Sequence, residues 1–114
     1  MDIEIKEFNG KGYKPLISFR GWRVAIVNYS DKLREDKIVK MERHLDTDEV
    51  FVLLQGNAAL HIGIEMKKYP LEIGKLYNVK KGIWHCITME ERAKVVVIES
   101  DDTDDTNTER VFFK

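Results

Sequence analysis

The sequence predicts an all-β fold with antiparallel strands. Short segments rich in β-branched and aromatic residues recur along the chain, and glycine, asparagine and lysine-rich turns separate them. No window of useful length repeats apolar residues at the three- and four-residue spacing of an amphipathic helix. The nearest candidate, residues 30–37, is too polar for more than one helical turn. Because parallel sheets need long crossover connections, usually helices, the strands are expected to form an antiparallel sandwich or barrel.

The expected strands follow one another at intervals of about 8 to 12 residues, which is the spacing of small sandwiches and barrels. Glycines supply the turns between several of them. After the last of these strands comes an acidic segment, 101–109, which we expect to be a solvated loop, and then the apolar segment RVFFK, which we expect to be a terminal strand. In chain order the clearest strand segments are 22–29, 51–54, 75–79, 83–88 and 94–99.

Length and charge limit the classes of function. The 114 residues suit one domain, 1–114, with the β-barrel core at about 16–100 and the acidic loop and terminal strand at 101–114. With 19 basic and 20 acidic residues, the chain has no basic face for a nucleic acid, so no nucleic-acid partner is expected. The apolar runs are far too short to cross a bilayer, and the N-terminus lacks the apolar stretch of a secretory signal. We therefore expect a cytoplasmic protein without a membrane partner.

One stretch, ERHLDTDEVFVLLQG (42–56), concentrates ligand-type side chains around a turn. Glu42 and His44 are two residues apart, so on a strand their side chains share a face. Residues 45–48 form a plausible turn, and Glu49 begins the strand that follows. In a hairpin of this kind Glu49 would return close to His44, so that two carboxylates and an imidazole could converge.

A second stretch, GKLYNVKKGIWHC (74–86), brings another imidazole. Residues 80–82 form a tight turn, and His85 follows within an apolar strand. His85 is expected to face inward and to be at least partly buried, whereas Cys86 would face the opposite way. We interpret Cys86, the only cysteine, as a small buried apolar residue. A second imidazole inside the barrel would complete a metal site.

Together the two stretches resemble the paired motifs of the cupins, small jelly-roll β-barrels. Here Glu42-x-His44 is followed after four residues by Glu49 and after six more by Gly56, the spacing of the first cupin motif. A second segment of the chain resembles the second cupin motif. In it Gly74 is followed by five residues, then by Lys80-Lys81-Gly82, two further residues and His85. The chain departs from the family where Glu42 replaces a histidine, Lys80 a proline and Met89 an asparagine, and where the opening glycine of the first motif is missing.

The resemblance implies a divalent transition metal, Fe, Mn, Ni or Zn, held by His44, Glu49 and His85, with Glu42 as a substitute fourth ligand. Two imidazoles and one or two carboxylates suit all four ions. The alternative for the histidines is that they only hydrogen-bond a ligand or each other, and Glu49 could instead pair with Arg43 or Lys40. The third histidine, His61, is expected to point outward and to have a structural role.

Two functions therefore stay open. The first is a metal-dependent enzyme acting on a small organic, possibly sugar-like, metabolite, for which isomerase, epimerase and dioxygenase-type chemistry all fit. The second is a non-catalytic, metal-free cupin that binds or senses a small molecule. A scaffold without a function in its pocket is the third alternative. The resemblance also implies a homodimer, since small cupins commonly pair through a sheet face.

Overall fold

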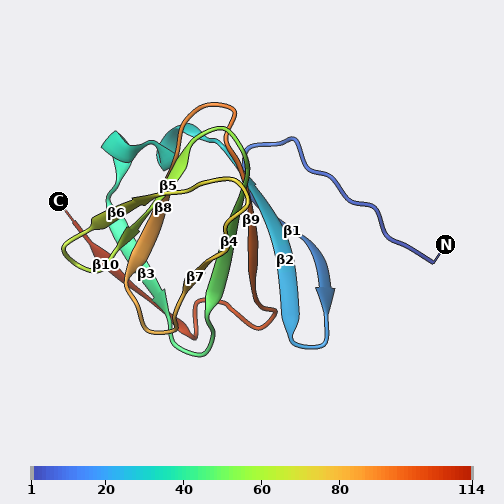
Figure 1. Cartoon of the computed structure of the whole chain (residues 1–114). Coiled ribbons are helices and arrows are strands. Elements are labelled where there is room, and N and C mark those ends of the chain that lie inside the picture. Colours follow the sequence, from blue (N-terminus) through green and yellow to red (C-terminus); the bar gives the residue numbers. More distant parts are fainter. Residues whose placement is uncertain (1, 114) are drawn as a thin grey trace.

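The computed structural model describes residues 2–113 as two antiparallel sheets that face each other (Figure 1). Sheet A has the strand order β1-β2-β9-β4-β7, and sheet B has the order β10-β3-β8-β5-β6. The strands of sheet A are β1 (Gly12–Phe19), β2 (Trp22–Asn28), β9 (Lys94–Ser100), β4 (Glu49–Gln55) and β7 (Tyr77–Val79). The strands of sheet B are β10 (Thr108–Phe112), β3 (Lys40–His44), β8 (His85–Met89), β5 (Ala58–Ile62) and β6 (Lys67–Pro70).

The predicted all-β, antiparallel jelly-roll arrangement is confirmed, but the two sheets do not close into a barrel. Each sheet keeps two edge strands, and within sheet B the strands β3 and β8 share one register pair, Glu42 with His85. The structure also has the strand β1 and the shorter strands β5 and β6, which were absent from the clearest expected segments.

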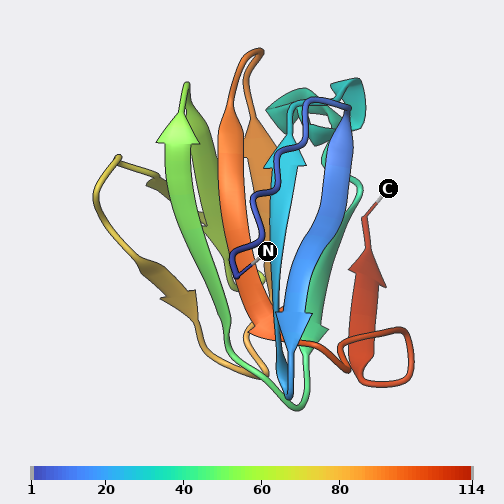
Figure 2. The same cartoon turned by 90° about the vertical axis from the view of Figure 1, so that its right-hand side faces the viewer.

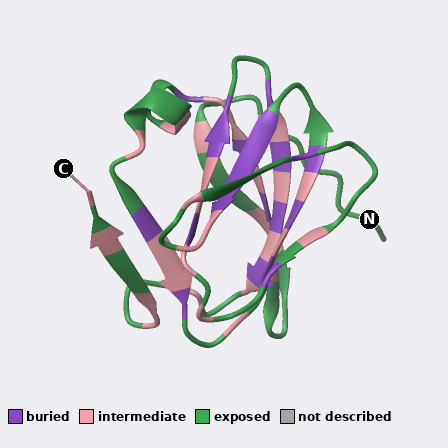
Figure 3. Ribbon diagram, turned by 60° about the vertical axis from the view of Figure 1, so that its left-hand side comes forward, coloured by how far each residue is buried: buried purple, intermediate pink, exposed green. Residues whose placement is uncertain are grey.

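Apolar side chains fill the space between the sheets because alternate residues of each strand point inward. Figure 3 shows buried segments along strands of both sheets. On β9 the inward residues are Val95 and Val97, and their register partners on β4, Leu53 and Phe51, are buried with them. Sheet B contributes residues such as Leu60, Ile87 and Met89 to the same cluster. Burial therefore alternates along these strands with the two-residue period that the sequence shows in the same segments.

The inward positions change from apolar to ionisable toward one end of the sandwich. On β4 the inward series runs from Leu53 and Phe51 to Glu49, and on β9 it runs from Val97 to Glu99. On β8 it ends at His85. Each of these charged or polar residues is buried. One end of the core is therefore a polar layer continuous with the apolar one.

Two helical turns connect the sheets between β2 and β3. They are the 3-10 helices η1 (Asp31–Leu33) and η2 (Glu35–Lys37), so residues 30–37 form two short helical turns where the sequence predicted one at most. Within residues 2–113, no helix has the length and apolar character needed to span a bilayer.

Candidate metal centre

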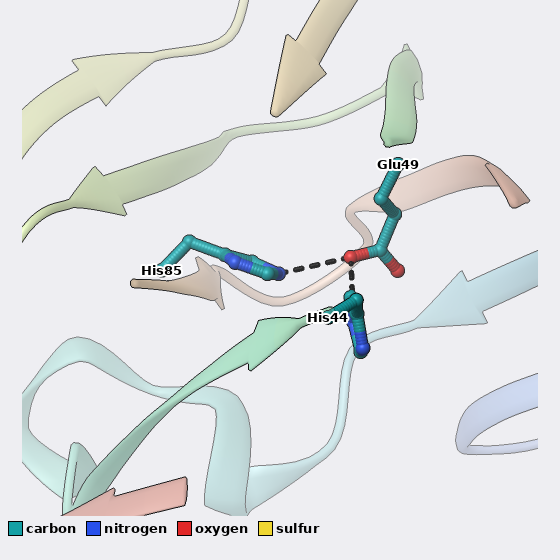
Figure 4. Close-up of side chains that lie close together, drawn as sticks. All are labelled: His44, Glu49 and His85. Carbon is teal, nitrogen blue, oxygen red and sulfur yellow. Dashed lines mark hydrogen bonds and ion pairs between the residues drawn. The ribbon is translucent and has the colours of Figure 1, made fainter. Parts of the chain in front are cut away.

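Three buried side chains from different strands converge on one point at the polar end of the core (Figure 4). His44 ends β3, Glu49 begins β4 and His85 begins β8. Glu49 Oε1 lies 3.1 Å from His44 Nε2 and 2.9 Å from His85 Nε2. One ligand atom from each residue lies within 4.8 Å of the other two. The structure therefore confirms that these three predicted residues come together.

The sequence suggested that a hairpin brings Glu49 back to His44, but β3 and β4 do not form one. β3 belongs to sheet B and β4 to sheet A, so residues 45–48 carry the chain from one sheet to the other. The two motif turns hold each other in place. The amide of Gly82 donates to the carbonyl of His44 at 2.7 Å, and the amide of Lys81 donates to Asp48 Oδ1 at 2.8 Å. These bonds explain why two segments 36 residues apart present their side chains to the same spot.

The far nitrogens of both imidazoles are also held. His85 Nδ1 lies 2.9 Å from the carbonyl oxygen of Ile83. A carbonyl only accepts hydrogen bonds, so Nδ1 carries the proton and the lone pair of a neutral His85 is on Nε2, which points to Glu49. His44 Nδ1 lies 2.9 Å from the Thr108 hydroxyl. A histidine that binds a metal is normally oriented in this way through its other nitrogen, so the donor set fits a metal ion.

The protonation equilibria of the cluster are linked. Burial alone would raise the pKa of Glu49, but hydrogen bonds from His44 and His85 and their positive charge lower it to about 2. Burial alone would lower the pKa of His44, but the hydrogen bond to Glu49 and its negative charge outweigh this and raise it. Glu49 is thus ionised at any neutral pH and gives the site a fixed negative charge.

Glu42, the expected fourth ligand, lies outside this group. Its Oε2 accepts a hydrogen bond from Arg110 Nε at 2.7 Å, and Arg110 also pairs with Asp105. The register of sheet B explains this, because Arg110 on β10 is directly opposite Glu42 on β3. Arg110, which neutralises Glu42, lies in the C-terminal segment. For that segment the sequence predicted only an acidic loop and a terminal strand.

The three-residue group lines a cavity of about 630 Å³ between the sheets. Apolar side chains, among them Phe51 and Val97, form part of its wall, and Phe51 stacks edge to face with His85 at 6.0 Å between ring centroids. Residues of the acidic loop, which the sequence assigned to solvent, also line it: Thr103, Asp104 and Asp105.

A second polar group in the same cavity was missed by the sequence interpretation. Glu99 Oε2 accepts hydrogen bonds from the Tyr13 hydroxyl at 2.8 Å and from Arg23 at 3.1 Å. Burial, and then the negative charge of Glu49, raise the pKa of Glu99, although Tyr13 and Arg23 oppose this shift. Arg23 and Glu99 are register partners at inward positions, which is the signal that could have found them.

The other residues considered from the sequence, His61, Cys86 and Arg43, lie outside the three-residue group. His61 lies on the face of β5 opposite to the core, as expected, but it is buried and hydrogen-bonded to the Thr88 hydroxyl at 2.8 Å. Burial, with the nearby charges of Glu35 and Glu42, raises the pKa of the Cys86 thiol to about 11, so it stays protonated as a weak nucleophile. Arg43 pairs with Glu109, not with Glu49.

No family model and no curated protein matches the chain. Solved structures do match it. A cupin-2 domain protein from Shewanella frigidimarina is 23% identical, covers 82% of this chain and 84% of its own, and gives a TM-score of 0.60. KdgF from Halomonas sp. is 19% identical over 82% of this chain and 81% of its own, with a TM-score of 0.62. The Streptomyces nucleoside dehydratase Pac13 is 12% identical over 95% and 85%, with a TM-score of 0.68.

These similarities show that the fold is a small cupin-like β-sandwich. At such identities they carry the fold alone, and the chemistry of the site rests on the residues described above.

Proposed function

We propose that the chain binds a divalent transition metal through His44, Glu49 and His85 and uses it to act on a small polar metabolite. The observation that carries the proposal is the convergence of two imidazole nitrogens on one buried carboxylate oxygen. Two nitrogens and one oxygen on a face open to a cavity are a donor set used by Fe, Mn, Ni and Zn. Such an ion would act as a Lewis acid toward a carbonyl or hydroxyl oxygen of the bound compound.

The chain's own residues would have distinct tasks. Glu49 supplies the negative charge that favours a cation, and the carbonyl of Ile83 keeps the Nε2 lone pair of His85 directed into the site. Glu99 faces the same cavity and is held by Tyr13 and Arg23. Because its pKa is raised, Glu99 is the carboxyl group best suited to exchange a proton with a bound compound.

A small polyhydroxylated or sugar-like ligand suits the cavity. Its volume of about 630 Å³ is within the usual range for small-molecule sites. The wall combines apolar surface, which excludes water, with ion pairs such as Arg110–Glu42 that can exchange hydrogen bonds with ligand hydroxyls. The similar fold of Pac13 accommodates uridine, which supports the size and polarity of the ligand but not its identity. Isomerisation or epimerisation and oxygen-dependent chemistry both agree with this site.

Metal-free binding is the second candidate, and one observation favours it. The separations of 2.9 and 3.1 Å are hydrogen-bond distances, so Glu49 is satisfied without an ion when each histidine donates an Nε2 proton to it, which for His85 requires the doubly protonated ring. In that case the cavity would hold a metabolite for sensing or storage.

Metal content separates the two candidates. We would purify the protein without chelators and measure bound metal by plasma mass spectrometry in the wild type, His44→Ala and His85→Ala. The chain has three histidines, so His61→Gln is a matched control that changes a buried imidazole outside the site. We expect one transition metal per chain in the wild type and in His61→Gln, and a loss of at least about tenfold in the other two.

A wild-type protein that neither retains a metal nor binds added Fe, Mn, Ni or Zn would contradict the metal site. Folded, metal-free protein that still binds a metabolite in the cavity would support the second candidate.

A further inference from the structure

The segment between β2 and β3, residues 31–40 (DKLREDKIVK), separates its charged side chains by sign. It contains four cations and three acids. All four cations line the cavity described above, whereas none of the three acids does. The four cations are Lys32, Arg34, Lys37 and Lys40. A mixed segment that is merely solvated has no reason to present one sign of charge to a cavity, so the separation indicates a ligand of opposite charge.

The three lysines of this segment have no counter-charge of their own. Arg34 pairs with Asp36 at 2.8 Å, and Glu35 pairs with Lys68 on β6 at 2.7 Å. The lysine ammonium groups have no ion-pair or hydrogen-bond partner among residues 2–113. All three are exposed, so an incoming anion can reach them. We name Lys32, Lys37 and Lys40 the lysine wall.

The buried and half-buried acids that line the cavity do not neutralise the lysine wall. Glu99 pairs with Arg23 at 3.1 Å, and Glu49 is held between two imidazoles. Glu42 pairs with Arg110 at 2.7 Å. Each of these three carboxylates is therefore compensated by its own neighbours.

The lysine wall and the acidic loop lie toward opposite ends of the molecule. Both Figure 1 and Figure 2 show the helical turns η1 and η2 at one end of the sandwich and the loop between β9 and β10 at the other. The remaining lining acids, Asp104 and Asp105, belong to that loop. His44 lies at the loop end of β3, since the amide of Leu45 donates to the carbonyl of Asn107 at 2.9 Å. The cavity therefore runs from a cationic end to the end that holds the three-residue group.

Strand β3 connects the two ends of the cavity. Lys40, Glu42 and His44 share one face of the strand, and all three line the cavity. Lys40 and His44 are separated by about 13 Å along the strand. Glu42 lies between them and would repel an anion, but Arg110 neutralises it. A ligand can thus extend along β3 from the lysine wall to the three-residue group without meeting an uncompensated carboxylate on that strand.

We propose that the metabolite of this cavity carries a phosphate group, and that the lysine wall binds this group while the rest of the compound extends toward His44, Glu49 and His85. The inference rests on the proposed function in that it concerns the ligand of the same cavity. A phosphate monoester has a charge of about −1.5 to −2 at pH 7 and three acceptor oxygens, which suits three ammonium groups.

The residue types favour a phosphate over a carboxylate. A carboxylate is bound best by the planar fork of an arginine, through two parallel hydrogen bonds. The arginine of this segment, Arg34, is already paired with Asp36. Lysines bind as point charges on flexible stems, so three of them can gather around one tetrahedral group. The phosphate would then hold the compound in one orientation, with its uncharged part at the three-residue group and Glu99.

Titration calorimetry at low ionic strength tests the proposal with four probes. Inorganic phosphate tests the phosphate site without regard to the carbon skeleton. Glucose 6-phosphate, glucuronate and glucose share a ring and differ at carbon 6, which carries a phosphate, a carboxylate or a hydroxyl group. We expect glucose 6-phosphate to bind at least about tenfold more tightly than the other two sugars, and added salt to weaken its binding. Protein treated with a chelator should still bind both phosphate probes, because the lysines and not a metal hold the group.

The triple variant Lys32→Gln, Lys37→Gln, Lys40→Gln should weaken the binding of both phosphate probes by at least about tenfold, and each single substitution by about two- to fivefold. The single variants provide the test if the triple variant fails to fold. Lys14→Gln is the matched control and should leave the affinity unchanged, since Lys14 is an exposed lysine of β1 that does not line the cavity. Metal content should be the same in all these variants.

Several results would overturn the proposal. They are the absence of binding by both phosphate probes, binding of glucuronate as tight as that of glucose 6-phosphate, binding that withstands the lysine substitutions, and binding that disappears with the metal. A wild type that holds a metal but gives any of these results would leave the proposed function standing. A protein that binds the phosphate probes through the lysine wall but takes up no metal would support this inference and contradict the metal site.

Discussion

His44 Nε2 and Glu49 Oε1 lie 3.1 Å apart although their strands belong to different sheets. Together with the 2.9 Å contact between Glu49 and His85, this contact ties sheet A to sheet B at the polar end of the core. Because these contacts exist only in the folded protein, the pKa values of Glu49 and His44 differ between the folded and unfolded states. Metal binding and folding stability should therefore both depend on pH.

The stability of the metal-free protein should be greatest between about pH 4.5 and 6.5 as far as this cluster is concerned. The folded pKa of Glu49, about 2, is lower than its usual value of 4.5, so its contribution is present above pH 4.5 and is lost as the pH falls toward 2. The folded pKa of His44 is raised above 6.5, so its contribution is complete below pH 6.5 and is lost as the pH rises through the raised value.

Urea denaturation in chelator at several pH values measures this profile. Glu49→Gln should remove both limbs of the profile, the decrease in stability toward acidic pH and the decrease above pH 6.5. It should also lower the free energy of unfolding by on the order of 3 kcal/mol near pH 6. Glu109→Gln, which removes a carboxylate on the surface, should leave both limbs in place. Parallel profiles for the wild type and Glu49→Gln would show that the cluster does not contribute to folding stability.

Metal affinity should fall as the pH is lowered, because a protonated imidazole has no lone pair for an ion. Glu49 stays ionised over the whole range, so protons compete with the metal at the imidazoles, and the raised pKa of His44 moves its part of the competition to a higher pH than for an ordinary histidine. Titration calorimetry with Ni²⁺ should show about a tenfold weaker affinity per pH unit below that pKa. An affinity independent of pH between about 5 and 8 would contradict ligation by His44.

Glu42→Gln should leave the metal content close to that of the wild type. In the structure this carboxylate pairs with Arg110 at 2.7 Å and lies outside the three-residue group. The substitution keeps the volume but removes the ion pair, so a loss of stability of up to about 1 kcal/mol is expected at this half-exposed position. Plasma mass spectrometry checks the result against Glu49→Gln. A similar loss of metal in both variants would restore Glu42 as the fourth ligand.

Tyr13→Phe should weaken the hydrogen bonding of Glu99 without changing the metal content. It removes the hydroxyl that donates to Glu99 at 2.8 Å and leaves Arg23 as the remaining donor to that oxygen. The expected loss in the free energy of unfolding is about 1 to 2 kcal/mol. Tyr69→Phe is a matched control, since Tyr69 is 40% exposed and its hydroxyl has no hydrogen-bond partner among the described residues. Equal stability of both variants would show that the bond to Glu99 adds nothing.

Local sequence pattern predicted most of the strands and the inward or strand-end positions of His44, Glu49 and His85, because both depend on short-range spacing. The two-residue period places His85 inward, and motif spacing places His44 and Glu49 at the ends of their strands. Glu42 also lies on the predicted face, but its partner, Arg110, arrives from a strand 68 residues away. Pairing over that distance depends on sheet order, which one sequence does not reveal.

The same limit explains why the second polar group was missed. Tyr13 and Glu99 are 86 residues apart and meet only because β1, β2 and β9 are neighbours in sheet A. It also explains the mistaken hairpin: a short acidic turn looks the same whether the chain returns along its own sheet or crosses to the facing one.

Gly56 and Gly74, one from each motif, should differ in their tolerance of alanine. Both have positive φ angles, +76° and +93°, so alanine strains the backbone at either position. At Gly56 a Cβ would also lie 2.7 Å from Ala93 Cα, whereas nothing lies within 4 Å at Gly74. Gly74→Ala should therefore cost about 1 kcal/mol.

Gly56→Ala should cost about 3 kcal/mol or more, because the strain of the positive φ and the overlap with the β8–β9 connection add together. The overlap involves backbone atoms, which cannot rotate away as a side chain would, so the relief must come from moving Ala93 and with it the start of β9. Chemical denaturation of the two variants measures the difference. If both lose the same stability, the close approach at Gly56 is absent in solution, and the positive φ alone accounts for the glycine in each motif.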